Sequence, residues 1–157
     1  MDAAVYQAVL AAPGFRLGIR CDDDEIRAIE FLEAGAEVAP QLPLAREAVR
    51  QLHAYLKDPR FVPGLPLQAC GTPFQRRVWG AIATIPCGQT RSYGELAQAV
   101  RSAPRAVGGA CGANPYPIVV PCHRIVAADG AMGGFARQRG GFLLEIKGWL
   151  LAHEGIR

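Results

Sequence analysis

The sequence predicts an α+β fold, in which a small N-terminal region with strands precedes a mostly helical C-terminal region. Apolar and polar residues alternate early in the chain, whereas helical spacing and helix-capping residues dominate later. Prolines and glycines concentrate between Pro59 and Gly71, and the local composition changes after this stretch. We therefore expect one domain over residues 1–70 and a second over residues 71–157.

The N-terminal region has a strand, turn, strand pattern followed by a helix. Apolar positions alternate over residues 15–21, an acidic turn covers residues 22–25, and a second apolar run covers residues 26–32. Over residues 44–56, apolar side chains recur at helical spacing while charged side chains occupy the opposite face. This region therefore predicts two strands and one amphipathic helix.

Three helices are expected in the first part of the C-terminal region. The segment Thr72–Gln75 has the residue types of a capped helix start and predicts a helix over residues 73–84. Ser92 and Glu95 repeat the capping pattern for a helix that ends near residue 100, and a third short helix runs from near residue 105 until Asn114-Pro115 stops it. The last two helices form a candidate helix-turn-helix because a tight turn joins them.

The rest of the chain carries a reactive tetrad and one more helix. Apolar residues 118–120 and 125–126 flank the tetrad Pro121-Cys122-His123-Arg124. Asp129-Gly130 predicts a hairpin-type turn. A last amphipathic helix is indicated by the apolar residues Leu143, Leu144, Ile146, Trp149 and Leu150.

Composition favours a folded protein with reduced cysteines. Half of the 157 residues are apolar, and the formal net charge of +3 permits a nucleic-acid partner without indicating one. The five cysteines are odd in number and form no CxxC pair, which argues against a disulfide framework or a zinc module. No signal peptide and no apolar run of roughly 20 residues is visible. We expect a cytoplasmic monomer that binds no metal.

The tetrad places a thiol, an imidazole and a guanidinium in consecutive positions. Neighbouring positive charge or a basic imidazole lowers the pKa of a cysteine, and the thiolate is the nucleophilic form. Cys122 is therefore a candidate nucleophile. Taken alone, however, a Cys-His dipeptide favours a simpler interpretation, in which Cys122 is a small buried residue and His123 an ordinary surface residue.

The context of the tetrad changes this balance, because ordered motifs extend from residue 71 to residue 155. They are Gly71–Gln75, Val78-Trp79, Ile85-Pro86, Gly88, Thr90, Ser92-Tyr93, Arg105–Ala110, Asn114-Pro115, Ile118–Arg124 and Leu150–Gly155. In this order they resemble the methylated-DNA–protein-cysteine methyltransferases, also called O6-alkylguanine-DNA alkyltransferases. The first 70 residues are compatible with the variable N-terminal lobe of that family, which is similar to a ribonuclease-H-like fold. The resemblance also implies a winged-helix-like C-terminal lobe.

The resemblance implies direct-reversal DNA repair. Cys122 would accept an alkyl group from O6-alkylguanine, and from O4-alkylthymine, in one irreversible transfer without any cofactor. His123 would act through a water as the base that keeps the thiol ionised, and Glu154 would orient the imidazole. Asn114 matches the asparagine that holds the turn behind the active cysteine.

The implied partner is double-stranded alkylated DNA, approached through its minor groove. The target base must be rotated out of the duplex, and Arg105 matches the arginine that fills the resulting gap. Ala106, Gly108 and Gly109 are small, so their helix can enter a narrow groove in which sequence is read poorly. Tyr93 matches the tyrosine that crowds the rotated nucleotide and lies near the base.

The predicted substrate pocket consists of Tyr93, Pro117, Arg124, Ile125, Gly134 and Phe135. The loop after the tetrad departs from the family pattern, because Phe135 replaces a tyrosine and about five residues are added, which puts the substrate range in doubt. Two arginines in that loop, Arg137 and Arg139, either meet a phosphate or only solubilise the loop.

Other interpretations remain open for single residues and for the whole protein. Arg105 fits a surface position, Tyr93 a core aromatic, Asn114 a helix stop and Glu154 a solvated charge. A protein that only flags alkylated DNA shares the scaffold but lacks the reactive cysteine. A cysteine hydrolase normally takes its nucleophile and its base from distant segments of the chain, whereas Cys122 and His123 are adjacent.

Overall fold

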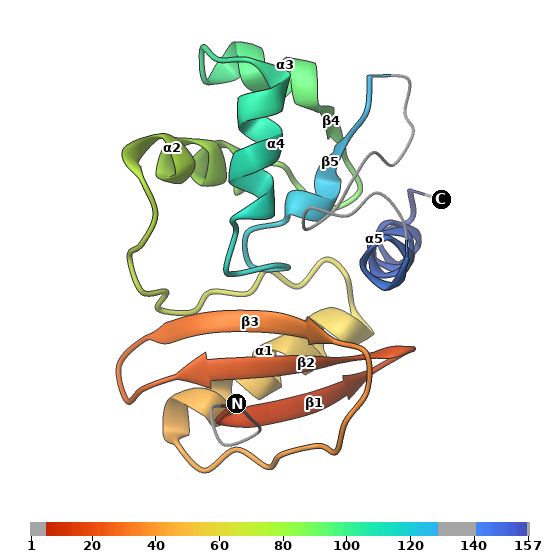
Figure 1. Cartoon of the computed structure of the whole chain (residues 1–157). Helices are drawn as coiled ribbons and strands as arrows, with labels where there is room; N and C mark the ends of the chain where they lie inside the picture. The colour runs from red at the N-terminus through yellow and green to blue at the C-terminus, as the bar shows by residue number, and fades with distance from the viewer. Residues whose placement is uncertain (1–5, 129–140, 157) are drawn as a thin grey trace. The chain divides into compact units, whose positions relative to one another are not determined.

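The computed structural model describes residues 6–128 and 141–156. The chain divides into two compact units, Met1–Ala69 and Cys70–Arg157, and we call them the N-terminal and the C-terminal unit (Figure 1). No helix among the described residues is long and apolar enough to cross a membrane. The two units are described separately below.

The N-terminal unit contains an antiparallel sheet of three strands and one helix (Figure 1). The strands β1 (Ala8–Ala12), β2 (Phe15–Cys21) and β3 (Ile26–Leu32) lie in this order, and α1 (Pro43–Lys57) packs against β1 and β2. The predictions of β2, β3 and α1 are confirmed. The strand β1 is not predicted by the sequence, because its five residues are apolar throughout and rich in alanine, which favours helices. It becomes a strand by pairing with β2 from Ala8↔Ile19 to Ala12↔Phe15.

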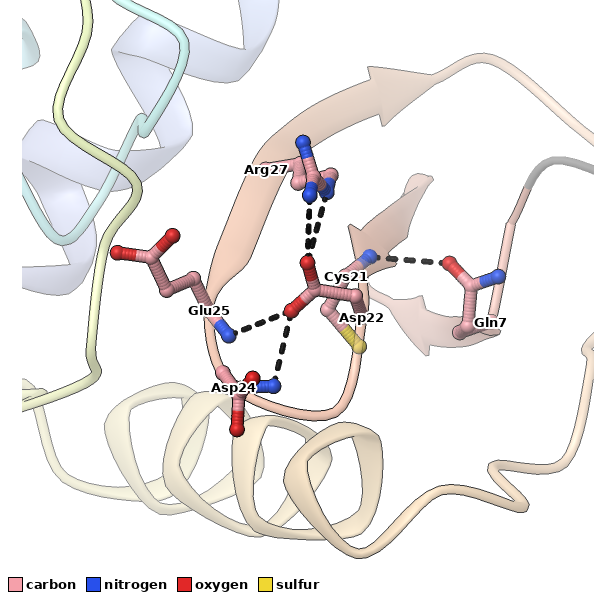
Figure 2. A network of polar contacts seen from close by, with 6 residues as sticks. All are labelled: Gln7, Cys21, Asp22, Asp24, Glu25 and Arg27. Carbon is pink, nitrogen blue, oxygen red and sulfur yellow. Dashed lines mark hydrogen bonds and ion pairs between the residues drawn. The ribbon is translucent and has the colours of Figure 1, made fainter.

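The acidic turn between β2 and β3 is a structural element organised by Asp22 (Figure 2). Its carboxylate accepts hydrogen bonds from the backbone N–H groups of Asp24 and Glu25, both at 2.8 Å, and from the Arg27 guanidinium. These backbone and side-chain hydrogen bonds lower the pKa of Asp22 to about 2. The acidic run therefore ends one strand and starts the next.

The C-terminal unit is mostly helical (Figure 1). In chain order it contains α2 (Pro73–Ile82), β4 (Arg91–Ser92), α3 (Tyr93–Ala99), α4 (Pro104–Gly112), the 3-10 helix η2 (Cys122–Arg124), β5 (Ile125–Val126) and α5 (Phe142–His153). The helices α2, α3 and α4 pack against one another, and the buried indole of Trp79 donates to the carbonyl of Ala110 at 2.8 Å. The short strands β4 and β5 pair in parallel, with Arg91 opposite Ile125. This pairing places the start of α3 beside the tetrad.

Local sequence signals set the starts of α2 and α3. The side chain of Thr72 accepts from the backbone N–H of Gln75 at 3.1 Å, and the backbone N–H of Thr72 donates to Oε1 of Gln75 at 2.9 Å. Ser92 and Glu95 exchange the same pair of hydrogen bonds at 3.0 and 2.7 Å. Both predicted capping boxes are thus confirmed, because the groups that satisfy the free N–H groups lie within one helical turn.

The helix ends differ slightly from the prediction. α2 stops at Ile82 rather than Thr84, and the Thr84 hydroxyl donates to the carbonyl of Ala81 at 2.7 Å in the turn that follows. α4 begins at Pro104, one residue before the predicted start, because proline is well suited to the first helical position. The predicted last helix is present as α5. The predicted turn at Asp129-Gly130 lies outside the described residues.

Candidate active site

Cys122 is held at the end of a series of tight backbone turns. Val120 donates its N–H to the carbonyl of Tyr116 at 2.8 Å, and Cys122 donates its N–H to the carbonyl of Val120 at 2.8 Å. Within this segment Ile118 has a positive φ of 75°, which is unfavourable for a β-branched residue. The apolar run therefore forms a strained turn, and η2 starts at Cys122.

The side chain of Asn114 holds this turn and contacts the sulfur. Its Oδ1 accepts from the backbone N–H of Tyr116 at 2.9 Å. Its Nδ2 donates to the carbonyl of Val120 at 2.9 Å and to Sγ of Cys122 at 3.2 Å. Asn114 therefore connects the two ends of the turn and gives the thiol an amide donor, and its part in a reaction stays a prediction.

His123 and Glu154 form a buried pair next to Cys122. Nε2 of His123 lies 2.8 Å from Oε2 of Glu154, and the two residues are 1% and 6% exposed. Burial lowers the pKa of His123, while the hydrogen bond that Glu154 accepts opposes this effect, so the imidazole is neutral near neutral pH. A carboxylate only accepts hydrogen bonds, so the neutral ring carries its proton on Nε2. Nδ1 is then the basic nitrogen, and it has no hydrogen-bond partner among the described residues.

Arg124 also binds Glu154. Its Nε and Nη2 donate to the two carboxylate oxygens at 2.8 and 2.9 Å, and its Nη1 donates to the carbonyl of Ile85 at 2.6 Å. Such a bidentate contact fixes the carboxylate and offsets the cost of burying it. The guanidinium therefore organises the His123–Glu154 pair, and its assignment to the substrate pocket stays a prediction.

Lys147 is a buried cation in the same region that sequence reasoning missed. It is 0% exposed, and its Nζ donates to the carbonyl of Ile125 at 2.7 Å. The same Nζ lies 5.9 Å from the centre of the Tyr93 ring. A signal was present in the sequence, because Lys147 shares one helical face with Leu143, Leu150 and Glu154. A lysine between two leucines on one helical face indicates a buried charge.

The thiol of Cys122 is buried beside a second thiol, that of Cys111. Cys122 is 5% exposed, and its hydrogen bond with Cys111 and its burial raise its pKa well above the usual range. The Asn114 amide and the charge of Lys147 act in the opposite direction. Whether these neighbours keep the thiol of Cys122 ionised stays a prediction.

Five residues predicted to meet DNA lie on α3 and α4. Tyr93 is the first residue of α3 and is half-buried. Arg105, Ala106 and Gly109 are exposed on α4, and Gly108 is half-buried. A Cβ atom built on either glycine would meet nothing within 4 Å. Packing within the described part of the chain therefore does not explain glycine at these two positions.

The remaining predicted pocket residues are divided by the structure. Pro117 is half-buried in the turn before Cys122, and Ile125 is fully buried in β5, where its carbonyl accepts from Lys147. Gly134 and Phe135 lie outside the described residues, as do Arg137 and Arg139. Among the described residues, no group of three or more His, Cys, Asp or Glu side chains could hold a metal ion.

A thiol contacted by an amide donor, next to a buried imidazole–carboxylate pair, is the arrangement typical of proteins with a cysteine nucleophile. Comparison with known proteins specifies which kind. The family profile described as "6-O-methylguanine DNA methyltransferase, DNA binding domain" matches residues 73–156. A methylated-DNA–protein-cysteine methyltransferase of Shigella flexneri is 37% identical over 164 residues, covering 93% of each chain. The chain belongs to the methylated-DNA–protein-cysteine methyltransferase family.

Other relatives and solved structures agree with this assignment. A constitutive methylated-DNA–protein-cysteine methyltransferase of Bacillus subtilis is 45% identical over 118 residues, which cover 74% of this chain and 69% of the relative. The crystal structure of the Mycobacterium tuberculosis O6-methylguanine methyltransferase matches with a TM-score of 0.78 and 35% identity, over 93% of this chain and 90% of that chain. A structure of the mycobacterial protein in complex with DNA matches equally well.

Proposed function

We propose that this chain repairs alkylated DNA by transferring an alkyl group from O6-alkylguanine, and from O4-alkylthymine, to Sγ of its own Cys122. The observation that carries the proposal is the position of the Cys122 thiol between an amide donor and a buried base. Asn114 donates to Sγ of Cys122, and a neutral imidazole oriented by Glu154 belongs to the adjacent residue, in a chain of the methylated-DNA–protein-cysteine methyltransferase family.

The reaction is a displacement at the alkyl carbon. The thiolate of Cys122 forms an S–C bond while the bond from that carbon to O6 of guanine breaks. The electron pair of the broken bond passes to the base, which takes up a proton and is restored to guanine. The product is a thioether, which water does not readily cleave, so each molecule reacts once. The reaction takes no cofactor.

Removal of the thiol proton is the step in which the surrounding residues act. Nδ1 of the neutral His123 ring is a buried base without a hydrogen-bond partner among the described residues, and it accepts the proton through one water. Glu154 stabilises the imidazolium that forms, as the carboxylate of a triad does. The Asn114 amide and the charge of Lys147 favour the thiolate on the sulfur.

The C-terminal unit is the one that binds DNA. Residues 70–157 contain ten Lys and Arg and four Asp and Glu, a formal charge of +6, whereas residues 1–69 contain seven and ten, a charge of −3. The basic unit attracts the phosphate backbone. Its helices α3 and α4 act as a helix-turn-helix of the winged-helix type, and α4 enters the minor groove.

Glycines in α4 support this placement. Glycine destabilises a helix interior by about 1 kcal/mol relative to alanine. The described residues around Gly108 and Gly109 leave room for a Cβ, so nothing in them requires glycine. A close approach of α4 to the duplex explains why the residues at these two positions are small. Arg105, exposed near the start of α4, fills the gap that the rotated nucleotide leaves, and Tyr93 contacts that nucleotide.

The two units differ in their proposed roles. The N-terminal domain over residues 1–70 is a ribonuclease-H-like lobe, and the domain over residues 71–157 binds DNA and accepts the alkyl group. The consecutive antiparallel strands β1, β2 and β3, followed by α1, are compatible with the start of such a lobe. We expect the protein to act as a monomer, since one unit carries the acceptor, the base and the DNA-binding helices.

The decisive experiment measures the intact mass of the protein after incubation with duplex DNA that contains O6-methylguanine. We expect one gain of about 14 Da, the mass of one added methylene, which is absent in Cys122→Ala. Cys70→Ser is the matched control and should gain the same mass, because Cys70 has no role in the proposed reaction and its sulfur lies 3.8 Å from the hydroxyl of Tyr116. An unshifted mass with tight DNA binding would instead indicate a protein that flags the lesion.

A further inference from the structure

The turn between α3 and α4 contains an exposed arginine in a conformation that usually requires glycine. At the end of α3 the N–H of Ser102 donates to the carbonyl of Ala97 at 2.8 Å, and the N–H of Arg101 donates to that of Gln98 at 3.2 Å. In this motif the residue after the helix cap is left-handed, and Arg101 has a φ of 57°. Glycine usually occupies this position, because a Cβ atom makes the left-handed conformation unfavourable. Arginine is therefore less stable here than glycine would be.

The end of α3 does not explain an arginine at this position. An arginine near a helix C-terminus can bind the last carbonyls and offset the negative end of the helix dipole. Arg77 on α2 already does this, since its Nη2 donates to the carbonyl of Val100, the cap residue of α3, at 3.3 Å. Arg101 is exposed, and its guanidinium has no hydrogen-bond or ion-pair partner among the described residues. Its side chain is thus available to a partner outside the chain.

The surroundings of Arg101 favour an anion as this partner. Residues 101–106 are all exposed, and Arg105 lies in the same segment. The sequence has no aspartate or glutamate between Glu95 and Asp129, so no carboxylate of this stretch competes for the guanidinium. A DNA duplex carries one negative charge per about 1.7 Å of its axis, and arginine binds phosphate through two parallel hydrogen bonds. Charge, exposure and position therefore agree with a phosphate of the DNA backbone.

We propose that Arg101 binds a backbone phosphate of duplex DNA and thereby fixes the position of α4 on the duplex. The proposal rests on the proposed function, because that function assigns DNA binding to α3 and α4. Arg101 is a positioning residue and takes no part in the chemical step. A phosphate contact carries no sequence information, which suits a protein that acts on lesions in any sequence. Arginine is kept although glycine would be more stable, because only the arginine side chain reaches the phosphate.

The test uses three variants that separate the charge of Arg101 from its backbone conformation. Arg101→Lys keeps the charge, Arg101→Asn removes the charge but tolerates the left-handed conformation, and Arg101→Gly removes both the charge and the strain. Arg76→Gln is the control, because it removes another exposed arginine of the same unit. Each protein is titrated with an unmodified DNA duplex at several salt concentrations, since a phosphate contact needs no lesion.

Loss of the phosphate contact should weaken binding without weakening the fold. We expect Arg101→Asn and Arg101→Gly to bind the duplex about tenfold more weakly, as for one lost hydrogen bond to a charged group. The slope of log K against log salt concentration should become less steep by about one unit. Arg101→Lys and the control should stay close to the natural protein in both measurements. Arg101→Gly should also unfold at a temperature about 2 °C higher, because the strain is gone.

Three results would overturn the inference. The first is an Arg101→Asn protein that binds the duplex with the affinity and the salt slope of the natural protein. The second is a loss of affinity in Arg101→Lys as large as that in Arg101→Asn. The third is a slower benzyl transfer from free O6-benzylguanine in Arg101→Asn, equal to its loss on duplex DNA. Free O6-benzylguanine requires no DNA binding, so this result would assign the effect of Arg101 to the fold.

The failure of the inference can be told apart from the failure of the proposed function. If the natural protein gains no methyl group from duplex DNA that contains O6-methylguanine, the proposed function fails and the inference fails with it. If the natural protein is methylated and the Arg101 variants bind the duplex unchanged, only the inference fails. Methylation of the natural protein together with weaker, less salt-dependent binding of Arg101→Asn supports both.

Discussion

The two units differ in where they keep their charged side chains. In the N-terminal unit the ion pairs are at the surface, as between Arg27 and Asp22, whose side chains are 49% and 40% exposed. In the C-terminal unit the carboxylate of Glu154 has a side-chain exposure of 0% and binds both His123 and Arg124. Exposed pairs contribute little to stability, whereas buried charges are expensive unless they are fully paired.

The comparison indicates where the fold serves a reaction. Burial of Glu154, His123 and Lys147 in one small unit costs free energy that an apolar core would not. Natural proteins usually depart from the most stable arrangement at functional sites. The net charges of −3 and +6 point the same way, because only the C-terminal unit is suited to a polyanion.

The largest expected effect comes from removing the buried charge. Glu154→Gln keeps the shape but leaves Arg124 and His123 without a carboxylate, so we expect the free energy of unfolding to fall by about 3 kcal/mol. In the N-terminal unit, Glu30→Gln removes a half-exposed partner of Arg20 and should cost less than about 1 kcal/mol. Urea unfolding measures both. Equal losses would remove the distinction between the units.

Arg105→Ala tests the DNA-binding part of the comparison. We expect alkyl transfer from duplex DNA to slow by about tenfold or more, because the rotated base loses the residue that fills its place. Transfer from free O6-benzylguanine should not change. Arg76→Ala, which removes another exposed arginine of the same unit, should have the smaller effect on duplex repair. Equal losses on both substrates would contradict the role given to Arg105.

The pH dependence of stability sharpens the contrast for His123. Its pKa is lowered in the folded protein, so the unfolded chain binds a proton more readily below its ordinary pKa of 6.5. The contribution of the neutral His123 side chain to the free energy of unfolding is fully present above pH 6.5. It is lost as the pH falls toward the pKa of the folded state, by up to about 1.4 kcal/mol per pH unit. The free energy of unfolding of His123→Gln should therefore depend less on pH in this range. An identical slope in urea titrations of the two proteins would refute the assignment.

The smallest effect is expected from the glycines of α4. Gly109→Ala should raise the free energy of unfolding by about 0.5–1 kcal/mol, since a Cβ meets no described atom and alanine favours the helix. The same change should weaken binding to duplex DNA, because the added methyl group obstructs the approach. Gly80→Ala on α2 is the matched control, with the same free space and no expected effect on binding. A Gly109→Ala protein that is more stable and binds DNA unchanged would remove α4 from the interface.

Much of the fold could be predicted because its signals are local. The alternation over β2 and β3 and the capping boxes at Thr72 and Ser92 act within one turn or one strand, so the sequence displays them directly. The strand β1 could not be predicted in the same way, since it depends on pairing with β2. The ends of α2 and α4 differ by one or two residues for a similar reason, because the neighbouring turns decide where a helix stops.

The candidate site shows the same division. The tetrad and the motifs around it were sufficient to predict Cys122, His123, Asn114 and Glu154 as a group, and the structure places Asn114 against the thiol and Glu154 against the imidazole. The structure also uses Arg124 to fix Glu154, a contact across 30 positions that no local pattern encodes.

The sequence by itself determined the family, the candidate nucleophile and most helix starts, because these depend on residue types in a fixed order. Only the tertiary structure decided which groups surround the thiol. Burial raises the pKa of Cys122, and the partners that oppose or share its charge come from α4, from the turn after it and from α5. Electrostatic energy depends on distance and on exclusion of water, and both are set by segments that are far apart along the chain.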